Sequence, residues 1–418
     1  MHDFQYKRSA LHAEDVPVEK IANRVGTPLY IYSHKTLLRH YNAFENAFDG
    51  YPHIICFALK ANSNGAILRA LAKEGCGADV VSGGELYLAR EAGIPPKKIV
   101  YAGVGKTGEE IRCALKSRIL MFNIESSDEL KAIDRIAGQM KMKAPVALRV
   151  NPNINASTHP YISTGLRKHK FGIAMESALE NYLLARKQVN TEIKGIHCHI
   201  GSQITKVSPF VDAVKRVLSL VRKLRKSGID IQYLDMGGGL GITYENEVSP
   251  YPADLAKEII PLVNKNDLTL ILEPGRSIAG NAGILVTKVL YLKDSPKKKF
   301  VIVDSGMNDL LRPSLYEAYH HILPVKKSRR AQVTADVVGP ICESGDFFAR
   351  ERSMNSPARD DLLAIMSAGG YGFSMSSNYN SRLRPAEVLV KGASFHVIRE
   401  REQYSDLSRG VRIPDFLK

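Results

Sequence analysis

The order of apolar and polar residues predicts alternating strands and helices over the first two thirds of the chain. Between residues 54 and 276, short apolar runs are separated by segments with helical periodicity. Several of the runs are continuous rather than alternating, as expected when both faces of a parallel sheet are buried. The predicted strands are residues 54–59, 78–81, 99–102, 119–124, 146–150, 195–200, 232–236 and 269–273.

The segments between these runs carry helix signals. The clearest begins at Ser208-Pro209 and ends before Gly228, with apolar residues repeated on one face, a proline suited to the first turn and a glycine suited to the C-terminal cap. Eight strands that are each followed by a helix indicate an α/β fold, a (β/α)8 TIM-like barrel. A doubly wound open sheet is the alternative, because spacing alone does not close a barrel.

After about residue 280 the pattern changes. Short β-rich runs are separated by turns rich in proline, glycine and lysine, which indicates a C-terminal all-β domain. The run PLYIYS, near residue 30, is one more β-rich segment. We therefore predict a barrel at residues 31–280 and a β-rich domain made of residues 281–418 together with the N-terminal residues 1–30.

The composition limits the classes of partner. The chain has 418 residues, and 44% of them are hydrophobic, which is enough for a large core. Its formal charge of +15 is dispersed rather than arranged in a stripe, and the sequence lacks aromatic RNA-reading motifs. The charge therefore favours the attraction of small anionic molecules, and we expect no nucleic-acid partner.

The cysteines and the N-terminus indicate a cytoplasmic protein. The five cysteines are scattered and form no CxxC pair, which favours reduced thiols. The first fifteen residues are charged throughout and lack the apolar core of a signal peptide. No stretch approaches the roughly 20 apolar residues that a membrane helix needs, so we expect no membrane partner.

The stretch ICFALKAN places Lys60 at the end of a predicted core strand. Burying an unpaired ammonium group is costly unless the group loses its proton. Lys60 is therefore either a lysine whose side chain reaches solvent from the strand end or a lysine that is used as an amine.

Other strand ends also carry reactive groups, and a barrel gathers the C-terminal ends of its strands on one rim. Asp79 lies in the second strand. His197 and His199, in HCHIGSQ, are either packed imidazoles or a metal pair, but no cysteine or carboxylate follows at ligand spacing, and we predict no metal site. The glycines of DMGGGLG form either a tight turn or a phosphate cradle. Glu273 and Arg276, in EPGR, are either a surface ion pair or part of a site.

Taken together, the rim groups match one ligand better than any of them does alone. An aldehyde reacts with a lysine amine, a phosphate binds glycine amides, a protonated pyridine nitrogen pairs with a carboxylate, and a flat ring needs a stacking face. That combination of groups is pyridoxal 5′-phosphate (PLP), which we predict as the cofactor.

The motifs FALKAN, GADVVSGGEL, HCHIGSQ, DMGGGLG, EPGR and GPICESGD occur in this order. They resemble the barrel-type PLP-dependent decarboxylases, in which an alanine-racemase-like barrel is joined to a C-terminal β domain. The resemblance covers nearly the whole chain, and it implies a carbon–carbon lyase.

The resemblance implies a role for most of the rim residues. Lys60 binds the PLP aldehyde covalently, His199 stacks on the ring, Glu273 pairs with the pyridine nitrogen, and Asp79 lies near the ring and the lysine. His197 receives no role. The other implied cofactor-binding residues are Ser202, Gly238, Gly239, Pro274, Gly275, Arg276 and Tyr371.

The resemblance is strongest to members of the family that act on meso-2,6-diaminopimelate, a diacid with an amino-acid group at each end. It implies decarboxylation to L-lysine and CO2, the last step of lysine biosynthesis. Two guanidinium groups and a phenol suit the distal carboxylate, and an acid and a serine suit the distal ammonium group. The implied substrate-binding residues are Arg276, Arg312, Tyr316, Glu343, Ser344 and Tyr371.

The implied catalytic residues are Lys60, His199, Glu273 and Cys342. Cys342 is the implied acid that returns a proton to the substrate α-carbon; the alternative is a buried, inert cysteine. In the family, the segment around this cysteine reaches the active site of a second copy. We therefore expect a homodimer whose active sites are shared across the interface.

Residues 155–172 contain two glycines and several basic residues, a composition that suits a mobile loop or lid over the rim. Ser163, Thr164 and Lys170 match the loop pattern of the family, but we assign them no catalytic role.

Two other functions stay open. A related decarboxylase acting on carboxynorspermidine, arginine, ornithine or lysine would share most of these motifs, although ornithine and lysine decarboxylases do not need an arginine clamp. A catalytically silent homologue that regulates a partner would have lost the lysine, the glycines or the cysteine, and the sequence retains all of them.

Overall fold

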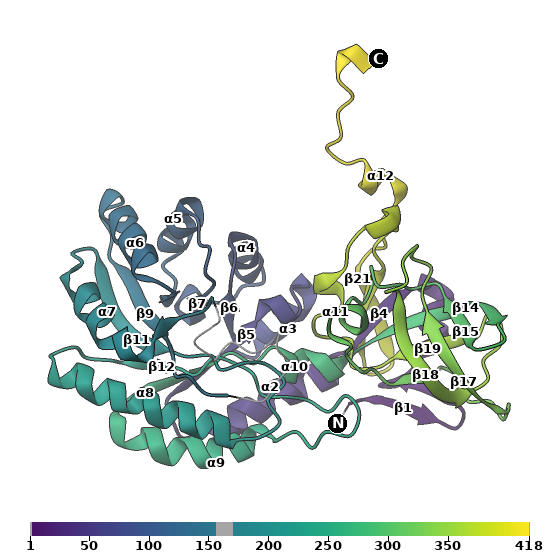
Figure 1. Cartoon of the computed structure of the whole chain (residues 1–418), viewed down its shortest axis with the longest axis horizontal. Helices are drawn as coiled ribbons and strands as arrows, with labels where there is room; N and C mark the ends of the chain where they lie inside the picture. The colour runs from purple at the N-terminus through teal and green to yellow at the C-terminus, as the bar shows by residue number, and fades with distance from the viewer. Residues whose placement is uncertain (1, 156–169, 418) are drawn as a thin grey trace. The chain divides into compact units, whose positions relative to one another are not determined.

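The eight predicted strands close into a parallel barrel (Figure 1). The protein is described by a computed structural model that covers residues 2–155 and 170–417. Each strand pairs in parallel with the next, and the last strand pairs with the first, which excludes the open-sheet alternative. The strands are β5 (His53–Ala58), β6 (Gly77–Val80), β7 (Ile99–Tyr101), β8 (Met121–Ile124), β9 (Ala144–Asn151), β11 (Thr191–His197), β12 (Tyr233–Asp235) and β13 (Thr269–Leu272).

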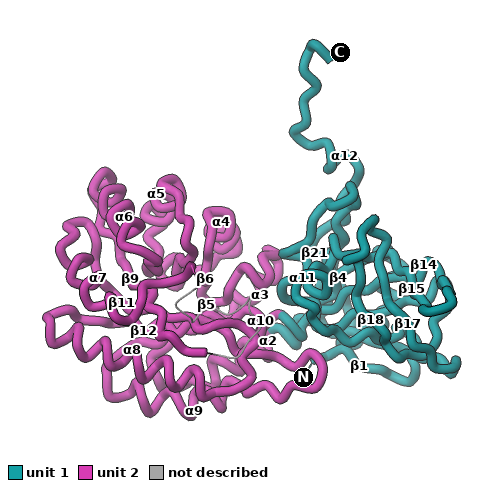
Figure 2. Tube along the Cα trace, viewed as in Figure 1, with its two compact units in different colours: residues 1–37, 280–418 teal, residues 38–279 magenta. Residues whose placement is uncertain are grey.

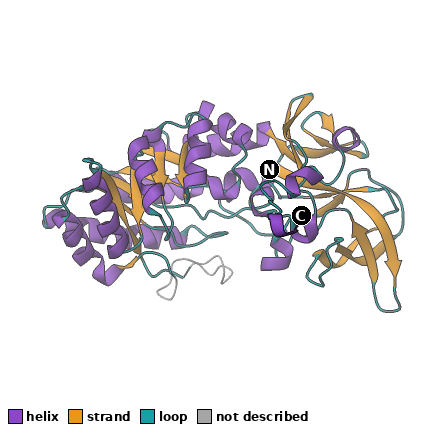
Figure 3. Ribbon diagram, turned by 90° about the horizontal axis from the view of Figure 1, so that it is seen from above, coloured by secondary structure: helices purple, strands orange, loops and turns teal. Residues whose placement is uncertain are grey.

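Helices follow the barrel strands and cover the outside of the ring (Figure 3). Several begin at polar caps, for example where the Ser82 and Ser126 hydroxyls accept backbone N–H bonds from the first turn. The short strand β10 (Ile173–Ala174) pairs with β9. The helices are α2 (His34–Phe48), α3 (Gly65–Lys73), α4 (Gly83–Glu91), α5 (Gly108–Ser117), α6 (Ser127–Gln139), α7 (Met175–Lys187), α8 (Ser208–Lys226), α9 (Pro252–Val263) and α10 (Arg276–Ala279).

The strongest helix prediction is confirmed by α8. It begins at Ser208, has Pro209 in its first turn and ends at Lys226, and Gly228 follows with a positive φ of 76°. Its apolar face is buried, as the helical spacing predicts.

The second part of the chain is rich in antiparallel strands, as the sequence pattern predicts. One small sheet contains β1 (Phe4–Lys7), β2 (Ala10–Ala13) and β3 (Val16–Pro17), and helix α1 (Val18–Val25) follows it. The strands of the larger sheet are β4 (Leu29–Ser33), β14 (Gly283–Asp294), β15 (Lys299–Val303), β16 (Ile322–Pro324), β17 (Gln332–Val338), β18 (Phe347–Asn355), β19 (Leu362–Ile365), β20 (Ala386–Lys391) and β21 (Ser394–Arg399).

The chain forms two compact units, shown in different colours in Figure 2. The barrel unit comprises residues 38–279, and the β-rich unit comprises residues 1–37 and 280–418. Strand β4 pairs with β14 and β20 and is buried along its length, so it belongs to the β-rich unit. The N-terminal part of that unit therefore extends to Leu37 rather than ending at residue 30.

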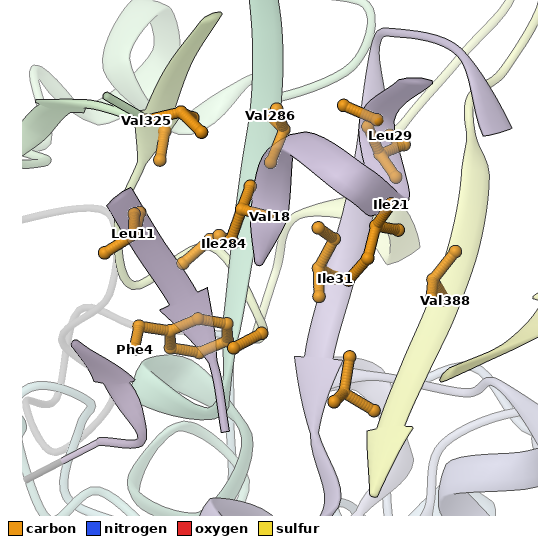
Figure 4. Close-up of a cluster of buried hydrophobic side chains, with 14 of the residues drawn as sticks. Phe4, Leu11, Val18, Ile21, Leu29, Ile31, Ile284, Val286, Val325 and Val388 are labelled. Carbon is orange, nitrogen blue, oxygen red and sulfur yellow. The ribbon is translucent and has the colours of Figure 1, made fainter. Parts of the chain in front are cut away.

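The core of the β-rich unit contains residues from both the N-terminal and the C-terminal parts of the chain. Side chains from the first 31 residues pack against strands that begin beyond residue 280 (Figure 4). Burial of these side chains ties the N-terminal segment to the C-terminal sheet. The labelled members of this cluster are Phe4, Leu11, Val18, Ile21, Leu29, Ile31, Ile284, Val286, Val325 and Val388.

Within the part of the chain that the structure describes, no helix has the length and apolar character needed to cross a membrane. The last described residues form the short helix α12 (Tyr404–Leu407) and then an exposed segment.

Candidate active site

Lys60 lies in a single 3-10 turn (Leu59–Ala61) directly after β5. Its ammonium group donates a hydrogen bond to Asp79 Oδ2, and Asp79 is fully buried in the neighbouring strand β6. The Lys60 side chain is 38% exposed, so the amine is paired inside the barrel end and still reachable from outside. This geometry answers the question that the strand end raises, because the lysine is neither fully buried nor unpaired.

The surroundings of Asp79 raise the pKa of its carboxyl group. Burial raises its pKa, the nearby Glu273 raises it further, and the charge of Lys60 lowers it only in part. Its Oδ1 atom is buried and lacks a hydrogen-bond partner among the described residues. Asp79 can therefore exchange a proton or a hydrogen bond with a group that approaches Lys60.

A second buried cluster surrounds Glu273, which follows β13. His197 Nε2 lies 3.7 Å from Glu273 Oε2, and Asn123 Nδ2 donates to Asp235 Oδ2 over 2.9 Å. The same Asn123 amide lies 3.4 Å from Glu273 Oε1. The members come from four strand ends, those of β8, β11, β12 and β13, so only barrel closure brings them together.

The surroundings shift the pKa values of the two carboxyl groups of this cluster, Asp235 and Glu273, in opposite directions. Burial raises the pKa of Asp235, and the neighbouring Glu273 raises it further. Burial also acts to raise the pKa of Glu273, but attraction to His197 and Lys60 outweighs it and leaves the pKa of Glu273 below its ordinary value. The cluster therefore holds one ionised carboxylate, on Glu273, and one carboxyl group that favours its proton.

The same cluster bears on the predicted absence of a metal. Ligand atoms of His197, Asp235 and Glu273 lie within 4.8 Å of one another, all on buried residues. Asp235 and Glu273 lie at the ends of other strands than His197, so their sequence spacing does not show that these carboxylates lie beside the histidine. The same three residues also suit a different ligand, because an anionic carboxylate such as Glu273 pairs with a cationic ring nitrogen.

His199 lies just beyond the end of β11, which stops at His197 rather than at residue 200 as predicted. Its Nδ1 atom accepts a 3.1 Å hydrogen bond from the Gly238 backbone N–H. Burial, together with the positive charge of Arg149, lowers the pKa of His199 to about 3. The imidazole therefore favours its neutral form at physiological pH.

The glycine run after β12 is required by close contacts. A Cβ atom at Gly238 would lie 2.2 Å from the Glu273 carbonyl oxygen. A Cβ at Gly239, which has a φ of 112°, would lie 2.3 Å from the Gly201 carbonyl oxygen. The backbone thus passes so close to its neighbours that only glycine fits at these positions.

Arg276 opens the short helix α10 and points to two hydroxyl groups. Its Nε and Nη2 atoms donate to Ser202 Oγ at 3.3 and 3.1 Å, and Nη1 donates to Tyr244 Oη at 2.7 Å. Before it, Pro274 accepts a backbone bond from β5, and a Cβ at Gly275 would meet the Cβ atoms of neighbouring alanines at 3.0 Å. The Arg276 guanidinium thus lies between the Ser202 hydroxyl and the Tyr244 phenol.

Three residues of this site were missed by the sequence analysis: Asn123, Asp235 and Tyr244. Asn123 is a polar residue inside the apolar run ILMFNI, and Asp235 opens the glycine motif, so the sequence marks both positions as unusual. Tyr244 lies in an irregular loop and carried none.

The predicted substrate residues lie mainly in the β-rich unit. Arg312 starts the short helix α11 (Arg312–Tyr316), is 5% exposed and contacts His320, while Tyr316, at the other end, is half-buried. Tyr371 is also half-buried and has a positive φ of 58°. The structure thus places the arginine in the unit's interior and the two phenols nearer its surface.

The turn that carries Cys342, Glu343 and Ser344 is exposed. Asp346 holds its base, because its carboxylate accepts backbone N–H bonds from Ile341 at 2.7 Å and Met307 at 2.6 Å. The Cys342 backbone N–H donates to Asn380, and Tyr379 Oη donates to Glu343 Oε2 at 2.8 Å. The expected alternative of a buried, inert Cys342 is therefore wrong, since the thiol is accessible in the single chain.

Of the predicted loop residues, Ser163 and Thr164 lie outside the described residues. Lys170 is described and exposed, and its ammonium group lies 5.3 Å from the centre of the Phe171 ring.

Comparisons with known proteins identify the family of this chain. A family model described as "Pyridoxal-dependent decarboxylase, pyridoxal binding domain" matches residues 34–280. A curated diaminopimelate decarboxylase of Aquifex aeolicus (strain VF5) is 52% identical over 401 residues, which are 96% of this chain and 95% of the relative.

Solved structures are similar over nearly the whole length. Diaminopimelate decarboxylase from Helicobacter pylori complexed with L-lysine has a TM-score of 0.91 and 45% identity, and the match covers 94% of this chain and 98% of that one. The M. jannaschii enzyme in co-complex with L-lysine has a TM-score of 0.95 and 42% identity, with full coverage of both chains. The predicted family, barrel fold and PLP cofactor are confirmed. The chain belongs to the PLP-dependent decarboxylases and, within them, to the diaminopimelate decarboxylase family.

Proposed function

We propose that this chain decarboxylates meso-2,6-diaminopimelate to L-lysine and CO2, the last step of lysine biosynthesis. The observation that carries the proposal is the barrel-end cluster, in which a lysine amine, an ionised carboxylate and a neutral imidazole converge from different strands. A buried site that combines these three groups suits an amine-reactive aldehyde attached to a nitrogen-containing ring.

The residues of the barrel unit fit PLP. Lys60 offers the amine, and Glu273 offers an anion that lies deep in the barrel, where a pyridine nitrogen would reach it. The glycine turn, where a Cβ has no room, lets a phosphate approach the backbone closely, and the Arg276–Ser202 pair offers N–H and O–H donors for it. When bound, PLP supplies an electron-accepting ring that takes up the electron pair left by the departing CO2.

The chain's own residues set up that chemistry. Glu273, whose pKa is lowered, would pair with a protonated ring nitrogen, and its charge is little screened by water because the side chain is buried. Lys60 is released from Asp79 when its amine is used, and Asp79, whose pKa is raised, can take up the proton that the amine gives away. His199, whose pKa is lowered, would stack on the ring.

The distal end of the substrate is assigned to the β-rich unit. Arg312 supplies a buried guanidinium for the distal carboxylate, Tyr316 and Tyr371 supply hydroxyl groups, and Glu343 with Ser344 receives the distal ammonium group. This assignment predicts that Arg312→Ala raises KM for diaminopimelate much more than it weakens PLP binding.

We further propose a homodimer in which Cys342 completes the active site of the other copy and protonates the substrate α-carbon. The support is that the motif residues of this turn are exposed in a single chain, while the turn itself is held rigidly by Asp346. A proton donor that is exposed on a rigid turn suits use across an interface. All five cysteines are free thiols, which suits the cytoplasm, where we place the protein.

The test is an assay of purified protein with added PLP, a panel of amino acids and detection of products by mass spectrometry. Lysine should form from meso-diaminopimelate, and CO2 release from ornithine, arginine, lysine and carboxynorspermidine should be far slower. Preferred release from one of those compounds would overturn the substrate assignment and leave the PLP assignment standing. No turnover of any amino acid by protein that binds PLP would favour the regulatory alternative.

A further inference from the structure

The guanidinium of Arg312 is held inside the β-rich unit by a histidine. Arg312 Nη1 lies 3.0 Å from His320 Nε2, and both side chains are buried, with His320 fully inaccessible to solvent. The other ring nitrogen of His320, Nδ1, lies 2.7 Å from the Met366 carbonyl oxygen. One imidazole thus bridges a guanidinium and a backbone carbonyl.

The two contacts fix the protonation of the ring. A carbonyl oxygen only accepts hydrogen bonds, so Nδ1 must carry a hydrogen. A guanidinium only donates, so Nε2 must present its lone pair to Arg312. His320 is therefore the neutral tautomer protonated at Nδ1, and its acceptor leaves the positive charge of Arg312 intact for an anionic ligand.

The histidine is itself fixed by the surrounding sheet. His320 immediately precedes His321 and β16, which pairs with β19, and the Met366 backbone N–H donates to the His321 carbonyl oxygen at 2.8 Å. Arg352 of β18 donates to the His320 carbonyl oxygen at 3.0 Å. The imidazole is thus anchored on both sides, and the position of its Nε2 atom is set by the fold.

We propose that His320 is a positioning residue for substrate recognition: its Nε2 lone pair orients the Arg312 guanidinium for the distal carboxylate of the substrate. This inference rests on the proposed function, in which Arg312 binds that carboxylate. The planar guanidinium makes two parallel hydrogen bonds to a carboxylate only in one orientation of its plane, so a fixed acceptor behind it determines how well it binds.

Two substitutions of His320 test its two hydrogen bonds separately, the one to the Met366 carbonyl and the one to Arg312. His320→Asn keeps a donor near the place of Nδ1 for the Met366 carbonyl but has no acceptor that reaches Arg312. His320→Gln places an amide oxygen near the position of Nε2 and so keeps an acceptor for the guanidinium. His321→Asn, a change of the exposed neighbouring histidine, is the matched control.

The expected result is a split between binding and turnover. His320→Asn should raise KM for meso-diaminopimelate about tenfold, the effect of losing a hydrogen bond to a charged group, with kcat and PLP affinity unchanged. His320→Gln should restore most of the affinity, and His321→Asn should behave as the wild type. A KM unchanged in His320→Asn would overturn the inference. So would equal losses in His320→Asn and His320→Gln, accompanied by a lower melting temperature, because they would mark a purely structural histidine.

A second measurement needs no substrate. In ¹⁵N-histidine NMR spectra of the wild-type holoenzyme, the resonances lost in His320→Asn should be those of a neutral ring protonated at Nδ1. A ring protonated at Nε2, or at both nitrogens at pH 7.5, would overturn the inference. If the wild type forms no lysine from diaminopimelate, the proposed function fails, and this spectrum still decides whether His320 holds Arg312 as an acceptor.

Discussion

The barrel end and the turn that carries Cys342 differ in how far their ionisable side chains are exposed to water. At the barrel end, Lys60, Asp79 and Glu273 converge from separate strands, the two carboxylates are buried, and their acidities are shifted by burial and by one another. On the turn, Cys342 and Glu343 are exposed and adjacent in sequence, and hydrogen bonds to Asp346 hold only the backbone beneath them. The barrel end is electrostatically complete within one chain, whereas the turn presents reactive groups that have no low-dielectric surroundings of their own.

The difference follows from desolvation. A charged group changes its acidity strongly only where water is excluded, and closure of the barrel excludes water from the ends of its strands. An exposed turn in a single chain does not exclude water in this way. The candidate-site carboxyl groups with shifted acidity, Asp79, Asp235 and Glu273, therefore all lie in the barrel unit, whereas Cys342 lies on a solvent-exposed turn.

The largest expected effect is that of Lys60→Ala. Loss of the amine should reduce decarboxylation by about a thousandfold or more, as is typical when a residue in covalent catalysis is removed. The visible absorbance that the wild type gains when PLP joins its lysine should be absent, as checked by spectrophotometry. Lys97→Ala, a change of an exposed lysine of the same unit, is the control. A purified Lys60→Ala protein with the wild-type spectrum would refute the assignment.

Cys342→Ala should reduce kcat by about 10²- to 10⁴-fold, the range for loss of a general acid, and leave the PLP spectrum unchanged. Cys113→Ala is a matched control, because Cys113 is also an exposed free thiol but lies in α5. Steady-state kinetics with meso-diaminopimelate measure both variants. A Cys113→Ala variant as impaired as Cys342→Ala would mean that general thiol loss, not the turn, is responsible.

Mixing the two inactive variants tests whether the turn acts in another copy. In a homodimer with shared sites, co-expressed Lys60→Ala and Cys342→Ala chains form mixed dimers with one intact site, so activity should return to about a quarter of the wild-type value. The mixture is assayed beside each variant alone. Activity no greater than the sum of the two variants would place both residues in the same chain's site and break the proposed division of labour.

A smaller effect concerns stability at the barrel end. Burial, aided by Asp79, raises the pKa of Glu85 to about 7. The folded state then holds a proton that the unfolded state releases above its ordinary pKa near 4.5, so this group's contribution to stability falls as pH rises from about 4.5 to 7. The loss is about 3 kcal/mol at most, from 1.36 kcal/mol per pKa unit.

The measurement is denaturant unfolding of apo protein at pH 5 and pH 8. Glu85→Gln should lose less stability than the wild type between these pH values, because its amide does not ionise. Glu343→Gln, on the exposed turn, should follow the wild-type dependence. Identical pH dependence in the wild type and Glu85→Gln would show that the barrel end does not shift this carboxyl group.

The smallest expected effect is that of Tyr379→Phe, which removes the hydroxyl that donates to Glu343. Because the bond is exposed, its loss should raise KM for diaminopimelate by only about threefold, equivalent to less than about 1 kcal/mol. Kinetics and the melting temperature are measured together. A lower melting temperature would show that the tyrosine supports the fold of the turn rather than the orientation of Glu343.

Much of the fold could be predicted because hydrophobic periodicity is a local signal. All eight barrel strands and α8 follow from runs of a few residues. The end of β11 could not be predicted, since the apolar pattern continues to Ile200 while the strand stops at His197. The position of β4 was also out of reach, because its partners β14 and β20 lie more than 240 residues away.

The candidate site divides in the same way. Lys60, Glu273, the glycines and Arg276 stand at strand ends within short motifs, so the sequence names them. Asn123 and Asp235 can be assigned to the site only because they lie near Glu273 in the fold, and His320 only because it contacts Arg312. Each of these contacts joins residues whose proximity is a property of the folded chain.

By itself, the sequence determined the strand and helix pattern, the order of the motifs and the kinds of reactive group at each strand end, because these depend on neighbouring residues. The tertiary structure alone decided which carboxyl group is ionised, that His199 is neutral and that Lys60 is paired with Asp79. It also decided that Cys342 is exposed. The physical reason is that acidity and exposure depend on the distance to charges and to water, and in this protein both are set by strands that close a ring across more than 200 residues of chain.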